Sequence, residues 1–446
     1  MPLNSFHWHK QRQIALIALP MVLSNLCVPL LGLVDTAVVG HLPQPHYLGG
    51  VALGGSIISL LYFLLGFLRM STTGLTAQAY GRGGDAATVQ CLQQGIILAL
   101  ALSALLLLLQ WPVIKLSVYF SDASSAVLQQ AERYFSVRIW SAPATLVNLV
   151  LMGWFLGRQN ARAPMWLLLF GNAVNIALDL LFVLVFGWYT AGVAAASVIA
   201  DYATLILALY LLWQSAGADI FNQLKKLRLT LHDSLPLLSL NRDIFLRSLC
   251  LQAVFVFIAF QGAAFGDSTL AANAVLLSFL LLVSYALDGL AYAAESLVGN
   301  AMGSKKSKDL SITLRLLSCW CLLLSVVFSL GYATFGTQLI ALLTSIDTVQ
   351  QEAARYLPWL MIIPLIASWA FLLDGIFIGA TQGALLRNSM FIALLGFAGC
   401  FWLLQQFENH ALWAAMTLFM ALRALALAYH LYRGKLKQAI YAEKNV

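Results

Sequence analysis

Carboxylates inside apolar segments are the side chains of this sequence best suited to chemistry. Asp35, Asp179 and Asp201 each interrupt a long run of apolar residues. A charged group in the hydrocarbon of a membrane is costly, so such a group usually marks an ion or substrate pathway. Two carboxylates that lie close together away from water cannot both stay charged cheaply. A pair such as Asp35 and Asp179 could therefore take up and release a proton.

Amides and a hydroxyl accompany these acids at helical spacing. Asn175 precedes Asp179 by four residues and Ser197 precedes Asp201 by four, so each pair shares one helix face. At about 1.5 Å per residue, Asp35, Asp179 and Ser197 lie roughly 7–11 Å from the same end of their segments, which predicts a polar chamber there. We assign cation coupling to Asp35, Asp179 and Asn175, and the chamber wall to Asn148, Asn172, Ser197 and Asp201. Asp35 and Asp179 could also hold Na⁺, and no other metal site is expected.

Polar side chains have a second common use in bilayers, because they tie neighbouring helices together by hydrogen bonds. That structural role stays open for Asn148, Asn175 and Ser197.

An internal repeat separates these acids from residues that serve the fold. A shift of 222 positions lays the sequence onto itself, and the shift becomes 220 near the end. Identical pairs include Ala52/Ala274, Ser56/Ser278, Gly81/Gly303, Gly153/Gly375 and Gly157/Gly379. Asp35 instead falls on Phe257, and Asp179 falls on Gly399. A repeat keeps what the fold requires, so acids present in one copy are candidates for function.

The composition indicates the medium in which these elements fold. Hydrophobic residues are 61% of the chain and charged residues 10%, whereas a soluble domain carries about 25% charged residues. Apolar runs long enough to cross a bilayer as helices follow one another along the chain, so we expect an all-α polytopic membrane protein. The twelve expected spans are Ile14–Gly40, Leu48–Gln78, Val89–Trp111, Ala131–Leu156, Pro164–Phe186, Ala191–Trp213, Ile244–Phe265, Ala271–Ala301, Ser311–Tyr332, Ala353–Ile378, Leu386–Gln405 and Leu412–Tyr432.

The distribution of cations predicts the topology. The loops on the side of the N-terminus hold seventeen Lys and Arg residues, against Lys115 alone in the opposite loops. Both termini are therefore expected in the cytoplasm, in a bacterial-type inner membrane. The net charge of +7 is spread over short segments and does not indicate nucleic-acid binding.

The polar stretch between the two copies predicts three parts. They are an N-lobe over residues 1–213, a cytoplasmic linker over 214–243 and a C-lobe over 244–446. An even number of spans in each copy makes the two six-helix repeats parallel. A monomer is expected, in contact with membrane lipid.

Prolines interrupt the first span, which also carries Asp35. Pro20 and Pro29 each remove a backbone donor and collide with the preceding turn. The sequence leaves open whether they form static kinks or a hinge.

The chain carries no motif of an enzyme. HExxH, GxSxG, a Walker loop and an acidic metal cluster are all missing from the sequence. No cofactor is expected, and the chain contains no ATP-binding motif, so any energy for transport would come from an ion gradient.

Three stretches carry a resemblance to a known family. LPMVLSNLCVPLLGLVDTAVVGHL (Leu19–Leu42), LGGVALGG (Leu48–Gly55) and FLRMSTTGLTAQAYG (Phe67–Gly81) resemble multidrug and toxic compound extrusion (MATE) transporters, and most closely the DinF-type branch. The resemblance implies a V-shaped, outward-open molecule that exports cationic and amphipathic compounds. It implies coupling to inward H⁺, or to Na⁺, through the positions of Asp35, Asn175, Asp179 and Ser197, with Pro20 as the bend of the first helix.

The related NorM-type branch uses acids on the seventh and tenth helices. Asp374 matches the second of these places, but the span Ile244–Phe265 carries no acid. From the combined arguments we expect protonation of Asp35 and Asp179 to move the first helix and expel a cationic substrate.

Three other functions remain open at this point. A flippase of lipid-linked precursors shares the superfamily architecture, but such a protein usually lines its cavity with several cations. Arg69, Arg138 and Arg423 are the cations identified inside spans here. A gated channel and an intramembrane enzyme are the remaining alternatives.

Overall fold

The computed structural model of this chain is helical throughout its described part. It describes residues 5–40, 44–217, 220, 223–224, 231–434 and 436, apart from the side chains of residues 5–7, 28–31, 33, 35–37 and 231–234. The helices are α1 (Ser5–Gly40), α2 (Pro45–Leu64), α3 (Phe67–Gly81), α4 (Asp85–Leu108), α5 (Gln110–Tyr119), α6 (Ser125–Arg138), η1 (Ile139–Ser141), α7 (Ala142–Gly157), α8 (Arg162–Asp179), η2 (Leu180–Val185), α9 (Tyr189–Ala216), α11 (Leu231–Ala264), α12 (Asp267–Gly303), α13 (Ser307–Leu343), α14 (Asp347–Gly379), α15 (Gly383–Leu404), η3 (Gln405–Phe407) and α16 (Asn409–Tyr432).

These helices confirm an all-α membrane protein. Within the described residues, eleven segments are long and apolar enough to cross a membrane, and each overlaps one of the expected spans. The expected first span, Ile14–Gly40, lies within α1. Helices dominate because hydrocarbon offers no water to hydrogen-bond an open backbone.

The internal repeat is visible in the backbone. Gly83 has a φ of 77°, and Lys305, which stands 222 residues later, has a φ of 56°. Gln159 and Thr381 form a second such pair, with φ values of 62° and 55°. The two copies therefore leave their helices through the same left-handed turns.

Glycines that match in the repeat sit at the closest helix crossings. A Cβ on Gly153 would lie 2.5 Å from the carbonyl oxygen of Arg69, and one on Gly375 would lie 2.5 Å from that of Ala291. Gly81 and Gly303 stand in matching places against α12 and α3, where a Cβ would lie 2.3 Å and 2.0 Å from the nearest carbonyl oxygens. Only glycine permits such an approach.

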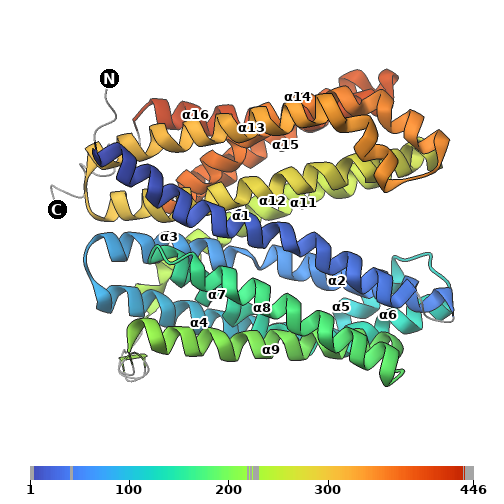
Figure 1. The fold of residues 1–446 in the computed structure, drawn as a ribbon, viewed down its shortest axis with the longest axis horizontal. Coiled ribbons are helices and arrows are strands. Elements are labelled where there is room, and N and C mark those ends of the chain that lie inside the picture. The colour runs from blue at the N-terminus through green and yellow to red at the C-terminus, as the bar shows by residue number, and fades with distance from the viewer. Residues whose placement is uncertain are drawn as a thin grey trace. The chain divides into compact units, whose positions relative to one another are not determined.

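The chain divides into two compact units that do not follow its midpoint. One unit contains Met1–Val22, Ala77–Gly83 and Leu238–Val446, and the other contains Leu23–Thr76 and Gly84–Leu237. The unit boundary thus falls inside α1 (Figure 1).

The expected N-lobe, linker and C-lobe boundaries stay predictions. Residues 231–243 of the expected linker are helical and continue into the seventh span as α11. Residues 218–219, 221–222 and 225–230 of that linker lie outside the described part.

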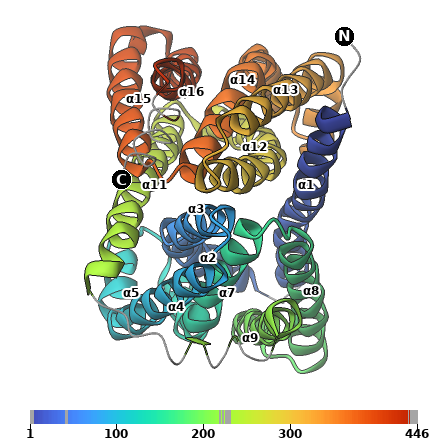
Figure 2. The same ribbon diagram turned by 90° about the vertical axis from the view of Figure 1, so that its left-hand side faces the viewer.

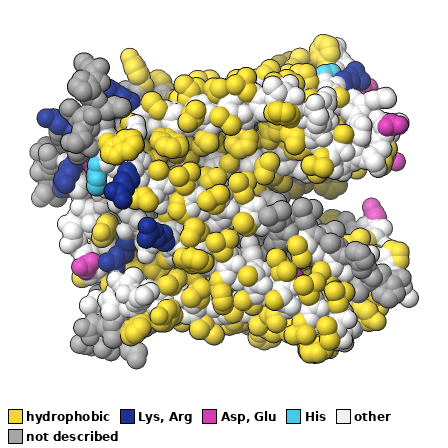
Figure 3. Space-filling model, viewed as in Figure 1, with side chains coloured by type: hydrophobic (Ala, Val, Ile, Leu, Met, Phe, Trp, Pro, Cys, Tyr) yellow, Lys and Arg dark blue, Asp and Glu magenta, His cyan; other side chains and the backbone are white. Residues whose placement is uncertain are grey.

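Each unit has its own hydrophobic core. In the first unit, α12, α13 and α14 lie together and α15 lies beside α16 (Figure 2). Their contact is filled by fully buried side chains such as Leu276, Leu360 and Phe419. In the second unit, α8 lies beside α9, and Phe135, Ile139 and Val193 belong to a separate core. Hydrophobic side chains cover the face of both units shown in Figure 3, as a lipid-facing surface requires.

We expect Gly303→Ala to destabilise the protein. Its new Cβ would press against the backbone of Gln78, and overpacking of this kind costs about 1–3 kcal/mol. Gly331→Ala in α13 is the matched control, since no atom lies within 4 Å of its Cβ position; alanine there favours the helix by up to about 1 kcal/mol. Thermal unfolding of the two purified variants is the measurement. Equal melting temperatures would contradict the packing argument.

Candidate functional site

Asp179 occupies the end of α8 and is completely buried. With the side-chain nitrogen of Asn175 turned toward it, that amide donates to Asp179 Oδ2 at 3.2 Å. The amide oxygen of Asn175 then accepts from the backbone nitrogen and Oγ of Ser197 at 3.2 and 3.1 Å. This orientation gives both amide atoms complementary partners. Three of the predicted residues therefore form one hydrogen-bonded chain between α8 and α9.

The helix changes its geometry directly after Asp179. Residues Leu180–Val185 (η2) form a π-helical turn, which widens the backbone by one residue per turn. Such turns are rare and are frequently found at functional sites.

A cavity of about 230 Å³ lies beside this chain, inside the second unit. Asn175 and Ser197 line it, whereas Asp179, the partner of Asn175, is not among the lining residues. The other polar residues of its wall are Arg138, Thr145, Asn148, Asn172, Asp201 and Thr204. The structure thus brings all four predicted chamber residues, and Asn175, to one cavity.

Asp201 is held by a cation on the opposite wall. Its Oδ2 accepts from the guanidinium of Arg138 at 2.8 Å and from Thr145 Oγ1 at 2.8 Å. The amide of Asn148 donates to the backbone carbonyl of Asp201 at 3.0 Å. Asp201 is therefore a carboxylate that already has a counter-ion.

Arg138 is positioned by aromatic and hydroxyl groups behind the cavity. Its guanidinium lies 5.5 Å from the centre of the Tyr62 ring, a distance that suits a cation–π contact. Arg138 also donates to Ser141 Oγ, which lies 2.7 Å from the hydroxyl of Tyr62. The cation is thus held from two sides.

Two amides of the wall keep spare hydrogen-bonding capacity. Among the described residues, Asn148 Oδ1 and Asn172 Nδ2 are buried atoms that have no protein partner. Asn148 is 7% exposed. An unmet buried acceptor is costly unless water or a ligand satisfies it. The cavity therefore offers an acceptor, a donor and a partly neutralised carboxylate to a small polar or cationic group.

Asp35 lies in α1 by its backbone, and its side chain lies outside the described part. Its pairing with Asp179 stays a prediction. Val38 and Val39, one turn further along α1, are buried in one cluster with Val183 of η2 and Val193 of α9. This end of α1 therefore packs against the elements that carry the Asp179 chain.

The start of α1 is anchored elsewhere. Lys10 forms an ion pair of 2.9 Å with Asp309, and Val22 packs so closely on α12 that a Cβ on Gly289 would lie 2.4 Å from it. Pro20 stands between these two contacts, and the unit boundary follows Val22. Pro29 has its backbone within α1, and its side chain lies outside the described part.

Asp374 was considered as an alternative cation site, and the structure surrounds it with arginines. Its Oδ2 accepts from both Arg247 and Arg423, and all three side chains are buried. Arg247 lies within the expected seventh span and in the middle of α11, and the sequence argument did not identify it. The signal that could have found it is the rule that a buried charge needs a partner.

Eleven described helical segments that are long and apolar enough to cross a membrane, and a cavity with polar side chains in its wall, define a multi-pass membrane protein. The MatE family model matches residues 20–181 and 244–402. The chain belongs to the MATE family, and within it to the DinF branch. It is a transporter of a family whose members are secondary transporters and not enzymes, typically ion-coupled and acting on small drug-like substrates.

Similar proteins cover almost the whole chain. DNA damage-inducible protein F of Escherichia coli (strain K12) is 47% identical over 430 residues, which are 94% of this chain and 90% of that protein. A probable multidrug resistance protein NorM of Bacillus cereus is 25% identical and covers 67% of each chain. The crystal structure of a MATE protein in complex with MaD3S has a TM-score of 0.87 at 18% identity, over 96% of this chain and 97% of that one. At 18% identity, the similarity to this crystal structure shows the fold alone.

Asp374→Asn should destabilise the protein strongly. Removing the shared carboxylate leaves two buried guanidinium groups without it, and breaking a buried ion pair in this way costs about 3–5 kcal/mol. Asp347→Asn is the control, because Asp347 is an exposed acid in the first turn of α14 of the same unit. Unfolding of both variants in detergent measures the difference. An Asp374→Asn protein as stable as the control would mean that the arginines do not depend on Asp374.

Proposed function

We propose that this transporter is an antiporter of the bacterial inner membrane, which exports cationic or amphipathic small molecules in exchange for inward-moving H⁺. The observation that carries the proposal is the buried carboxylate of Asp179, held by the neutral amide of Asn175 beside the cavity. A carboxylate removed from water gains much from a proton or a bound cation. Na⁺ remains the second choice of coupling ion at Asp35 and Asp179.

The mechanism uses competition between proton and substrate. A cationic substrate in the cavity would contact the amides of Asn148 and Asn172, and the carboxylates of Asp35 and Asp179 would attract it from beyond the cavity wall. Protonation of the acids removes the negative charge that attracts the substrate. The same event changes the hydrogen bonds between Asp35 and the Asn175–Asp179 chain. Both effects favour release.

Movement of α1 would link protonation to the shape of the cavity. Its start is tied to α12 and to Asp309, and its far end packs beside η2 and α9. Pro20 lies just before the residue at which the helix passes from one unit to the other, and its missing hydrogen bond lowers the cost of bending there. We assign the hinge to Pro20. Both termini are assigned to the cytoplasm on the basis of the cation distribution.

The alternative of a flippase for lipid-linked precursors is less well supported. Such a protein needs free cations in its cavity to hold a diphosphate. Arg138 is engaged by Asp201, and both Arg247 and Arg423 are engaged by Asp374. These three arginines therefore neutralise acids of the protein itself.

Asp35→Asn and Asp179→Asn should each stop coupled transport, because an amide keeps the shape of the carboxylate but cannot titrate. Asp374→Asn should retain transport when the rate is normalised to folded protein, because its carboxylate is already neutralised by arginines. The measurement is efflux of a cationic dye from proteoliposomes, with the pH gradient and the Na⁺ gradient imposed separately. Loss of transport in Asp374→Asn beside normal transport in Asp179→Asn would move the coupling site to the other unit.

A second experiment tests the hinge. Spin labels at Gly32, where a side chain has open space, and at Leu330, which is 60% exposed in α13, report the distance between α1 and the other unit. The distribution should change between about pH 8 and about pH 5.5, a range in which a desolvated carboxylate can take up a proton. The change should vanish in Asp35→Asn and weaken in Pro20→Ala, with Pro29→Ala as the matched control. A wild-type distribution that does not respond to pH would refute bending.

A further inference from the structure

A second pocket, of about 620 Å³, lies at the turn between α12 and α13, apart from the cavity around Asp201. Four lysines line it: Lys10 from α1, Lys305 and Lys306 from the turn, and Lys308 from the first turn of α13. Among the residues of its wall, Asp309 is the one acid. The site is therefore strongly positive.

The lysines of the turn are absent from the first copy of the repeat. With the shift of 222, Lys305, Lys306 and Lys308 fall on Gly83, Gly84 and Ala86. Lys305 keeps the left-handed φ that Gly83 has in the first copy, 56° against 77°. A lysine adopts this conformation at a cost that glycine avoids. The second copy thus carries a lysine where glycine would adopt the backbone conformation at lower cost.

The geometry around the turn favours a phosphate group. α13 is a 37-residue helix that begins at Ser307, and its first three residues, Ser307, Lys308 and Asp309, line the pocket. The positive end of the helix dipole and the lysines attract the same sign of charge. Lys10 and Asp309 pair at 2.9 Å with side chains only 12% and 15% exposed. This pair forms a fixed wall, while Lys306 and Lys308 remain exposed to a ligand.

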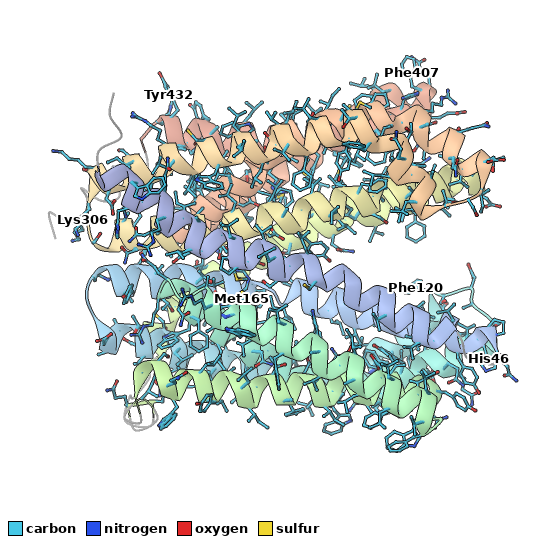
Figure 4. The ribbon with its side chains drawn as sticks, viewed as in Figure 1. His46, Phe120, Met165, Lys306, Phe407 and Tyr432 are labelled. Carbon is cyan, nitrogen blue, oxygen red and sulfur yellow. The ribbon has the colours of Figure 1, made fainter. Side chains whose placement is uncertain are left out.

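The position of the pocket favours a lipid headgroup over a soluble phosphate as its ligand. It connects the ends of α12 and α13, both of which are long and apolar enough to cross the membrane. Lys306 lies at the same end of its unit as Tyr432, opposite to Phe407 (Figure 4). Basic pockets at the cytoplasmic ends of membrane helices are suited to anionic lipid headgroups. We propose that this pocket binds the phosphate headgroup of an anionic phospholipid of the inner leaflet.

The test measures lipid binding to the full-length protein in detergent. The protein is titrated with phosphatidylglycerol or with phosphatidylcholine, and native mass spectrometry detects the bound lipid. Phosphatidylglycerol should bind more tightly to the wild type. Lys306→Gln/Lys308→Gln should weaken that binding by about 25-fold, since each lysine near an anionic lipid contributes about fivefold. Both side chains are exposed, so folding should be unaffected, and size-exclusion chromatography checks this.

Arg162→Gln/Arg433→Gln is the matched control, because it removes two exposed cations that do not line the pocket. If the control weakens phosphatidylglycerol binding equally, the lipid is attracted by diffuse surface charge and not by this pocket. That result would overturn the proposal. Equal binding of the two lipids would also overturn it. Inorganic phosphate and soluble glycerophosphate diesters are then each added as competitors of the lipid. If inorganic phosphate displaces the lipid as well as the diesters do, the ligand is a free phosphate and the proposal is overturned. None of these outcomes depends on transport, so the proposed antiport stands or fails separately.

Discussion

The cost of a charge inside hydrocarbon is the constraint on which the rest of this structure depends. The charge of Asp374 is stabilised by two arginines, and that of Asp201 by Arg138 and a threonine hydroxyl. The charge of Asp179 is stabilised in part by the neutral amide of Asn175. A carboxylate with a permanent cation beside it has little to gain from a proton, whereas one held by an amide gains more. We propose coupling at Asp179, whereas Asp201 and Asp374 are engaged by arginines.

α1 is the element that could transmit the effect of protonation from one unit to the other. Its start is fixed by an ion pair with Asp309 and by the tight contact of Val22 with Gly289. Its end is buried beside Val183 and the helix that carries Ser197. A helix whose two parts belong to different compact units has to accommodate any displacement between them. A proline at the junction provides a place where the backbone ladder is already interrupted.

The internal repeat shows which features the fold requires and which are additions. Glycines at close crossings and left-handed residues at helix exits appear in both copies, because backbone contact leaves no room for change. The Asn175–Asp179 pair appears in the first copy and the lysines of the α12–α13 turn in the second. Two different charged sites have thus been placed on equivalent helical frameworks.

The sequence by itself determined the helical membrane architecture, the repeat and the candidate acids, because apolar length and helical spacing are local properties. Asp35, Asp179 and Ser197 could be grouped by their depth along the helix axis, and Asn175 by its spacing of four residues from Asp179. The tertiary structure decided which charges meet: Arg138 with Asp201, and Arg247 with Asp374, are contacts between helices far apart in the chain. Helix rotation and crossing depend on packing against all neighbours at once, and a single sequence does not encode them as a readable pattern.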